Sequence, residues 1–289
     1  MSESEPRFIP LAESYEHVRR TVRNSNFYYS FLLLDQARCD SLSAIYAFMR
    51  RCDDLVDCPN ADPQAFDAWR REMGAALGTG YPADPMWPAF IDTVRRHGIP
   101  QRYFYDHMEG VASDLVRPKR IRTFGELYQY CYRVASTAGM CLIHVYGYRS
   151  QEALLLAEKC GVAFQITNIL RDVREDLEMD RIYLAAEDLA RYRVTEDDLR
   201  LTYVTPQVRD LFVAYASRAR SLYHEAQGLL KMVTPQTRPA LWAIMELYSR
   251  LLDHIVMKDF EVLTTRVSLS KWEKARILIR ARYLPWTCS

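Results

Sequence analysis

Glycine is scarce in this chain, at 10 of 289 residues, and no run alternates apolar and polar residues between tight-turn signals. An all-β fold needs both features, so it is not expected. The chain also has no P-loop and no GxGxxG run, the usual phosphate-binding loops of nucleotide folds. A GxSxG elbow, which would mark a hydrolase nucleophile, is missing as well. The sequence therefore favours a helical protein with a different kind of site.

An excess of either charge is also lacking, because 38 Lys and Arg residues nearly balance 37 Asp and Glu residues. This balance gives no reason to expect a nucleic-acid partner. The one compact basic run, RPKRIR at 117–122, is interpreted as a solvated turn.

The seven cysteines include no CxxC pair, which indicates free thiols in a reducing compartment and disfavours a zinc site. The N-terminal stretch MSESEPRF does not have the pattern of a signal peptide. No apolar run approaches the roughly 18 residues of a membrane-spanning helix. A cytoplasmic protein is predicted.

Helical hydrophobic patterns fill most of the chain and stop at segments that contain Pro or Gly, such as DCPNADP and VTPQTRP. No interdomain linker and no solenoid-type repeat is visible. We therefore predict that residues 1–289 form a single all-α domain, a bundle around a central cavity. The expected helices span 10–23, 36–56, 63–77, 85–97, 100–116, 123–147, 150–179, 206–232, 236–266 and 270–282.

A stripe of acids and amides occupies the end of the predicted 150–179 helix, in QITNILRDVREDLEMDRIYL (165–184). Steps of four residues, which stay on one helical face, lead from Asn168 through Asp172 and Asp176 to Asp180. Gln165 shares this face. Carboxylates at this spacing repel one another, so the stripe needs a compensating cation. Its flanks carry Arg171, Arg174 and Arg181.

A second stripe ends the predicted 36–56 helix, in YAFMRRCDDLVD (46–57). Its members recur at i, i+4, i+7 and i+11, and they are Tyr46, Arg50, Asp53 and Asp57, with Asp54 beside them. Carboxylates in an apolar setting are costly to desolvate. Mg²⁺ relieves this, because it prefers oxygen ligands and bridges to substrate phosphates. The alternative for either stripe alone is an ordinary surface ion pair, such as Arg50 with Asp54.

Other catalytic centres fit the sequence less well. A di-iron bundle needs Glu three residues before His, and none of the six histidines has it. There is no HExxH motif either. His144 and His254 are interpreted as core histidines, because they lie in apolar helical surroundings.

The pairing of NxxxDxxxD, within NILRDVREDLEMDRIYL, with YAFMRRCDDLVD resembles the squalene/phytoene synthase family. The similarity runs from about Asn24 to Arg266. It implies the all-α isoprenoid synthase fold. It also implies a Mg²⁺-dependent prenyltransferase that joins two prenyl diphosphates head to head through a cyclopropylcarbinyl diphosphate.

The resemblance also implies roles for individual residues. Mg²⁺ would be held by Asp53, Asp54, Asp57, Asn168, Asp172 and Asp176. The substrates would contact Asn26, Tyr46, Arg50, Gln165, Asn168, Arg171, Tyr248 and Arg266. Tyr130, in YCYRVASTAG, would face the reaction centre, where either it or the departing diphosphate accepts the proton. The expected wall of the cavity is apolar and aromatic, with Phe27, Tyr46, Phe48, Phe164 and Tyr248 as candidates.

Three departures from the family pattern affect the expectation. Asn24, Ser25 and Asn26 stand where serines that contact diphosphate are common. Ser136 replaces a frequent glycine. The second motif reads RDVRED and not RDYxED, which is closer to the bacterial hopanoid and carotenoid branches than to eukaryotic squalene synthases.

The expected reaction is therefore the conversion of two farnesyl diphosphates to presqualene diphosphate or squalene, with NADPH needed in the second case. The alternatives are a phytoene synthase acting on two geranylgeranyl diphosphates and a dehydrosqualene synthase. A head-to-tail elongase is disfavoured by the second motif, and a non-catalytic helical scaffold is the remote alternative. Because the prenyl substrates and products are hydrophobic, peripheral contact with a membrane surface is also expected.

Overall fold

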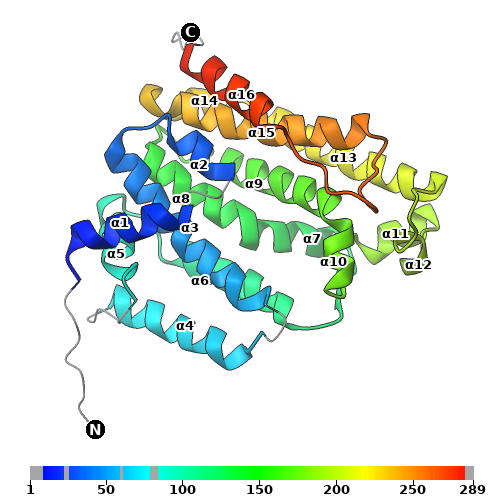
Figure 1. The fold of residues 1–289 in the computed structure, drawn as a ribbon, viewed down its shortest axis with the longest axis horizontal. Coiled ribbons are helices and arrows are strands. Elements are labelled where there is room, and N and C mark those ends of the chain that lie inside the picture. Colours follow the sequence, from blue (N-terminus) through cyan, green and yellow to red (C-terminus); the bar gives the residue numbers. More distant parts are fainter. Residues whose placement is uncertain (1–8, 23–25, 59–60, 79–83, 284–289) are drawn as a thin grey trace.

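Helices carry nearly all the regular structure of this computed structural model, which describes residues 9–22, 26–58, 61–78 and 84–283. Figure 1 shows them stacked in layers. The α-helices are α1 (Leu11–Val22), α2 (Asn26–Phe31), α3 (Gln36–Val56), α4 (Pro63–Leu77), α5 (Trp87–Arg96), α6 (Arg102–Ala112), α7 (Phe124–Cys131), α8 (Thr137–Tyr146), α9 (Glu152–Arg171), α10 (Val173–Glu178), α11 (Ala186–Tyr192), α12 (Glu196–Leu199), α13 (Pro206–Ala226), α14 (Leu229–Met232), α15 (Arg238–Met257) and α16 (Lys271–Tyr283). The remaining elements are the short helices η1 (Ser113–Leu115), η2 (Tyr132–Ser136) and η3 (Pro235–Thr237) and the strands β1 (Lys119–Arg120) and β2 (Arg181–Ile182). An all-α fold is confirmed.

Helix α9 runs through the middle of the bundle (Figure 1), where it packs against α8, α13, α15 and η2. Among the described residues it is the one helix long and apolar enough, by length and composition, to cross a membrane, contrary to the expectation that no run would approach this. Of that apolar window, 56% is buried inside the bundle. Central helices of bundles are commonly apolar on all sides, so this composition follows from its position.

A π-helical segment, η2, interrupts the predicted 123–147 helix between α7 and α8. Two glycines let neighbouring helices approach it. A Cβ on Gly110 of α6 would lie 2.6 Å from Cβ of Arg133, and one on Gly161 of α9 would lie 2.5 Å from Cα of Ser136. The hydroxyl of Ser136 donates a 2.7 Å hydrogen bond to the carbonyl oxygen of Glu158. The glycine that allows this close contact is therefore Gly161 of α9, and Ser136, which stands where the family often has glycine, packs against it.

The predicted 150–179 helix bends in the acidic stripe. Helix α9 ends at Arg171 and α10 begins at Val173, while Asp172 between them has φ −106° and ψ 17°. The amide of Asp176 still donates to the carbonyl of Asp172, so these two residues remain one turn apart. Asp180 does not continue the stripe: it lies beyond α10, has φ 55°, and pairs with Arg120.

Other boundaries differ from the prediction too. The predicted 236–266 helix stops at Met257, shortly before Asp259 and Phe260 adopt positive φ. Helices α2, α11 and α12 were not predicted, because each has seven residues or fewer and shows little periodicity. The run RPKRIR is not a solvated turn. It contains β1, which pairs in parallel with β2 through Lys119 with Arg181 and Arg120 with Ile182.

Candidate active site

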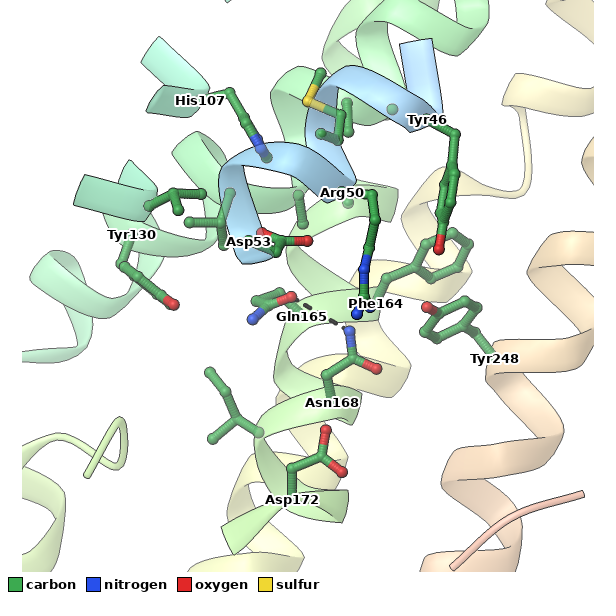
Figure 2. Close-up of a pocket in the computed structure, with 18 of the residues that line it drawn as sticks. Tyr46, Arg50, Asp53, His107, Tyr130, Phe164, Gln165, Asn168, Asp172 and Tyr248 are labelled. Carbon is green, nitrogen blue, oxygen red and sulfur yellow. Dashed lines mark hydrogen bonds between the residues drawn. The ribbon is translucent and has the colours of Figure 1, made fainter. Parts of the chain in front are cut away.

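A cavity of about 520 Å³ opens between α3, α9, α10 and α15, with η2 and α8 at its back. Its charged lining residues gather where α3 and α9 end, and its apolar lining extends back along both helices. Figure 2 shows Arg50 and Asp53 of α3 opposite Gln165 and Asn168 of α9. The cavity thus has a charged end and an apolar end.

The stripe on α3 reaches the cavity through Tyr46, Arg50, Asp53 and Asp57. Asp57 caps the C-terminus of α3 and accepts a 2.7 Å hydrogen bond from Arg181. Asp54 is absent from the cavity lining. Its carboxylate instead pairs with Arg50 at 2.8 Å on the exposed side of the helix. The proposed metal-binding role of Asp54 therefore finds no support in this geometry, whereas the surface pair foreseen as the alternative is present.

The stripe on α9 and α10 brings Gln165, Asn168, Asp172 and Asp176 to the opposite wall. The side-chain amide nitrogen of Asn168 donates a 3.3 Å hydrogen bond to Oε1 of Gln165, and the side-chain oxygen Oδ1 of Asn168 is buried without a hydrogen-bond partner in the described part of the chain. Glu175, which the sequence-based prediction omitted, also lines the cavity. Its oxygen Oε2 is likewise buried without a hydrogen-bond partner among the described residues. Both oxygens are available to a ligand.

Ionisation is strongly perturbed at this charged end. Burial, and then the charge of Asp57, raise the pKa of Asp53 to about 7. Burial, and then the charge of Asp172, raise the pKa of Asp176 to about 8. Asp172 behaves differently: burial opposes its ionisation, but hydrogen bonds from Arg171 and Arg266 bring its pKa below the ordinary value. Carboxylates that repel one another when ionised are what a bound cation would stabilise.

The donor set fits Mg²⁺. The side-chain oxygens that would be shared among the bound ions belong to Asp53, Asp57, Asn168, Asp172 and Asp176. Within the described ranges, no three carboxylate, histidine or cysteine groups come close enough to hold an ion by themselves. An ion here would therefore take one or two carboxylates and complete its shell with diphosphate and water oxygens, which is the usual mode of Mg²⁺.

Two arginines converge on Asp172 from different segments. Nε of Arg171 lies 2.7 Å from Oδ1 of Asp172, and its Nη2 contacts the other oxygen. Nε of Arg266, from the segment between α15 and α16, lies 2.8 Å from the same Oδ1. Both guanidinium groups line the cavity, so each can donate paired hydrogen bonds to a diphosphate. Tyr248 lies beside them, stacked on Phe164 with ring centroids 4.1 Å apart.

Tyr130 faces the cavity from α7, within a network that the sequence did not reveal. Its hydroxyl donates a 2.7 Å hydrogen bond to buried Asp114, and its ring stacks on Tyr183 at 4.7 Å. Nζ of Lys119, from the RPKRIR run, lies 3.6 Å from the other oxygen of Asp114. The guanidinium of Arg181 contacts the backbone carbonyl of Asp114 at 3.4 Å. Asp114, Lys119 and Tyr183 were missed because no helical spacing links them, although the isolated basic run was a usable signal. Arg181 was noted only as a flank of the acidic stripe.

The predicted aromatic wall is only partly present. Tyr46, Phe164 and Tyr248 line the cavity. Phe48 does not, because it points to the other side of α3 and packs fully buried against Phe90 and Phe104. Two predicted side chains, those of Asn26 and Phe27, together with Asn24 and Ser25, lie outside what the structure describes.

Comparison with known proteins places this geometry in a family. Residues 21–273 match the squalene/phytoene synthase family. The chain is 36% identical over 285 residues to a 15-cis-phytoene synthase from Synechococcus elongatus, with 91% of each chain covered. Among solved structures it is similar to a dehydrosqualene synthase in complex with ligand, with TM-score 0.88, 28% identity, and 94% of this chain and 96% of the other covered. It also resembles the squalene synthase HpnC from Alicyclobacillus acidocaldarius, with TM-score 0.80, 26% identity, and 87% and 97% covered.

These matches span nearly the whole chain, including both aspartate stripes and the cavity between them. Members of the matched family are prenyltransferases that condense prenyl diphosphates head to head and generally depend on Mg²⁺. The chain is an enzyme of the squalene/phytoene synthase family.

Proposed function

We propose that this enzyme is a phytoene synthase, which condenses two geranylgeranyl diphosphates. The proposal rests first on the similarity to the 15-cis-phytoene synthase, which extends over 91% of both chains. It departs from the sequence-based preference for farnesyl diphosphate, which depended on a short stretch around the second motif. The apolar depth of the cavity gives it independent physical support.

The apolar end of the cavity is deep, and its lining includes small residues among larger ones. From Asn168 back to Ala157, α9 lines the cavity over roughly 16 Å. Ala157 of α9 and Ala138 of α8 face the cavity. Small side chains on both helices leave space for a long prenyl chain, which a bulkier residue would shorten.

The charged end would bind and ionise the diphosphates. Mg²⁺, when bound, neutralises negative charge that develops on the leaving diphosphate. Arg50, Arg171 and Arg266 would contact diphosphate oxygens, and their positive charges favour departure of the group. The salt bridges of these arginines to Asp54 and Asp172 would then loosen as the diphosphate replaces the carboxylates.

The apolar walls would protect the allylic cation from water. Phe164 and Tyr248 present a stacked aromatic pair to the cavity, and the faces of such rings attract positive charge. The cation forms a bond to the C2–C3 double bond of the second substrate, and loss of one proton closes the cyclopropane ring.

Tyr130 and Asp114 supply a route for that proton. Burial, followed by the charge of Asp114, raises the pKa of Tyr130 well above its ordinary value, so the phenol is neutral and is not a free base. Its oxygen can take the substrate proton while its own proton moves to Asp114 along the 2.7 Å hydrogen bond. Burial raises the pKa of Asp114, which favours the protonated product of this transfer.

A farnesyl-using activity is the second candidate, because the dehydrosqualene synthase and the squalene synthase HpnC share the fold over most of the chain. One incubation separates the candidates. Purified enzyme and Mg²⁺ receive either geranylgeranyl or farnesyl diphosphate, with and without NADPH, and extracts are analysed by mass spectrometry. A C40 product supports the proposal, and a C30 product made in preference to it overturns the proposal. A C30 product that changes with NADPH would identify a squalene synthase.

A further inference from the structure

Helix α16 presents an apolar stripe to solvent on the outside of the bundle. Trp272, Ile279 and Tyr283 are 81%, 60% and 77% exposed. With Arg276 they recur at i, i+4, i+7 and i+11, which is one helical face. The buried face of the same helix carries Ile277 and Ala281 and packs on α15 and α2.

Helix α16 carries a net positive charge. Its sequence, KWEKARILIRARY, holds five basic residues and one acidic residue. The acidic one, Glu273, is engaged by His254 at 2.9 Å. Four of the basic side chains have no carboxylate ion-pair partner in the part of the chain that the structure describes, and they are Lys271, Arg276, Arg280 and Arg282. The guanidinium of Arg280 lies over the ring of Trp242, at 5.4 Å from its centroid, which leaves its charge uncompensated.

The position of α16 connects this surface to the active site. Figure 1 shows the helix at the outer edge of the bundle, above α15 and α2. The segment that leads into it carries Arg266, whose guanidinium lines the cavity and binds Asp172. The exposed stripe thus begins six residues after a side chain of the charged end.

We propose that α16 is a docking surface for an anionic lipid bilayer. Tryptophan, isoleucine and tyrosine suit the boundary between headgroups and acyl chains, and basic residues on the same helix bind acidic headgroups. Two copies of the chain would not pair through this face, because a twofold contact would bring like charges together. The proposal concerns only the location of the enzyme. It is independent of which prenyl diphosphate the enzyme uses.

Vesicle flotation of the full chain tests the proposal. The vesicles contain phosphatidylcholine alone or phosphatidylcholine with phosphatidylglycerol, at low and high salt. Wild type floats with the anionic vesicles and is released by salt. The variant R276Q/R282Q loses roughly 25-fold in partitioning, about fivefold per charge. The variant W272A/I279S loses about tenfold or more, because its inserted apolar area is removed.

The matched control is Y203A/V213S, two substitutions at residues that are 63% and 50% exposed in the turn before α13 and on α13. It should float like wild type. All variants should retain prenyltransferase activity on detergent-dispersed substrate, which shows that they fold. Equal binding to neutral vesicles, or unchanged flotation of both α16 variants, overturns the proposal. So does a wild-type dimer that the α16 variants convert to monomer, or binding of a single-stranded oligonucleotide in place of vesicles.

Discussion

The hydroxyl of Tyr130 donates a 2.7 Å hydrogen bond to Oδ2 of Asp114, and both side chains are buried at the wall of the cavity. Lys119 lies 3.6 Å from the other carboxylate oxygen. A buried phenol–carboxylate pair of this kind can move a proton only if both members are present. In the proposed mechanism, the pair would link substrate chemistry to a residue, Asp114, that lies in no recognisable motif.

Replacement of either member should slow turnover. Tyr130→Phe and Asp114→Asn each remove the transfer route, so we expect kcat to fall by about 100-fold with little change in KM. Tyr128→Phe is the matched control, because Tyr128 lies on the same helix but bonds to Glu158, away from the cavity. Steady-state kinetics with radiolabelled prenyl diphosphate measure the effect. If Tyr130→Phe keeps the wild-type kcat, the departing diphosphate is the proton acceptor.

Replacement of Asp53 should leave stability equal or higher but lower the activity. Asp53→Asn removes a carboxylate whose ionisation is opposed by burial and by Asp57, so the ligand-free variant should melt at an equal or higher temperature. Turnover should nevertheless fall at least about 100-fold, since charge compensation at the leaving group is lost. Asp54→Asn, on the exposed side of the same helix, should keep nearly full activity.

Thermal shift separates binding from chemistry in the same proteins. Mg²⁺ with pyrophosphate should raise the melting temperature of wild type and of Asp54→Asn, because both ligands bind only the folded state. The shift should be much smaller for Asp53→Asn and Asp172→Asn. A full shift in these two variants would refute the metal assignment, and EDTA should reverse the shift and the activity together.

The site residues that lie on long helices could be predicted from the sequence, because helical spacing is periodic. Helix α3, which carries one of the two stripes, was predicted with the right boundaries, Gln36–Val56, because its spacing is periodic. The same spacing leaves Asp54 beside the stripe, which agrees with its place outside the cavity lining; its metal-binding role was implied only by the family resemblance. Asp180 was misplaced because the helix ends two residues earlier, at Glu178.

The remaining site residues depend on tertiary structure. Asp114, Lys119 and Arg181 come from η1, β1 and β2, elements of two or three residues with no periodic signal. They meet because β1 pairs in parallel with β2. The close contacts of η2 likewise depend on glycines in α6 and α9, which lie far from it in sequence. Local patterns could not have revealed these pairings.

His107 should make the fold sensitive to acid. It is 2% exposed, and burial lowers its pKa to about 4. The unfolded chain, with an ordinary pKa of about 6.5, binds the proton first. Stability from His107 is therefore full above about pH 6.5 and is lost as pH falls towards 4, by up to about 3 kcal/mol.

Urea unfolding of wild type and His107→Gln at several pH values between 4 and 7 isolates this contribution. Asp53 and Asp176 act in the opposite direction, because their raised pKa values make the folded state bind protons first, but they are common to both proteins. The free energy of unfolding should fall more steeply with acid in wild type. Parallel curves would show that His107 is protonated in the folded state.

Ala157 offers a test of what sets product length. It is 2% exposed, lines the apolar end of the cavity, and lies eleven residues before Asn168 on α9. Ala157→Leu should fill that end, so the use of geranylgeranyl diphosphate should fall about tenfold or more relative to farnesyl diphosphate. Overpacking should also destabilise the fold by about 1–3 kcal/mol. Ala163→Leu is the control, because Ala163 is fully buried on α9 but does not line the cavity. It should lower stability similarly while the C40 to C30 ratio in competition assays stays unchanged. A ratio that shifts equally in both variants would mean that packing strain, and not cavity depth, controls the choice of substrate.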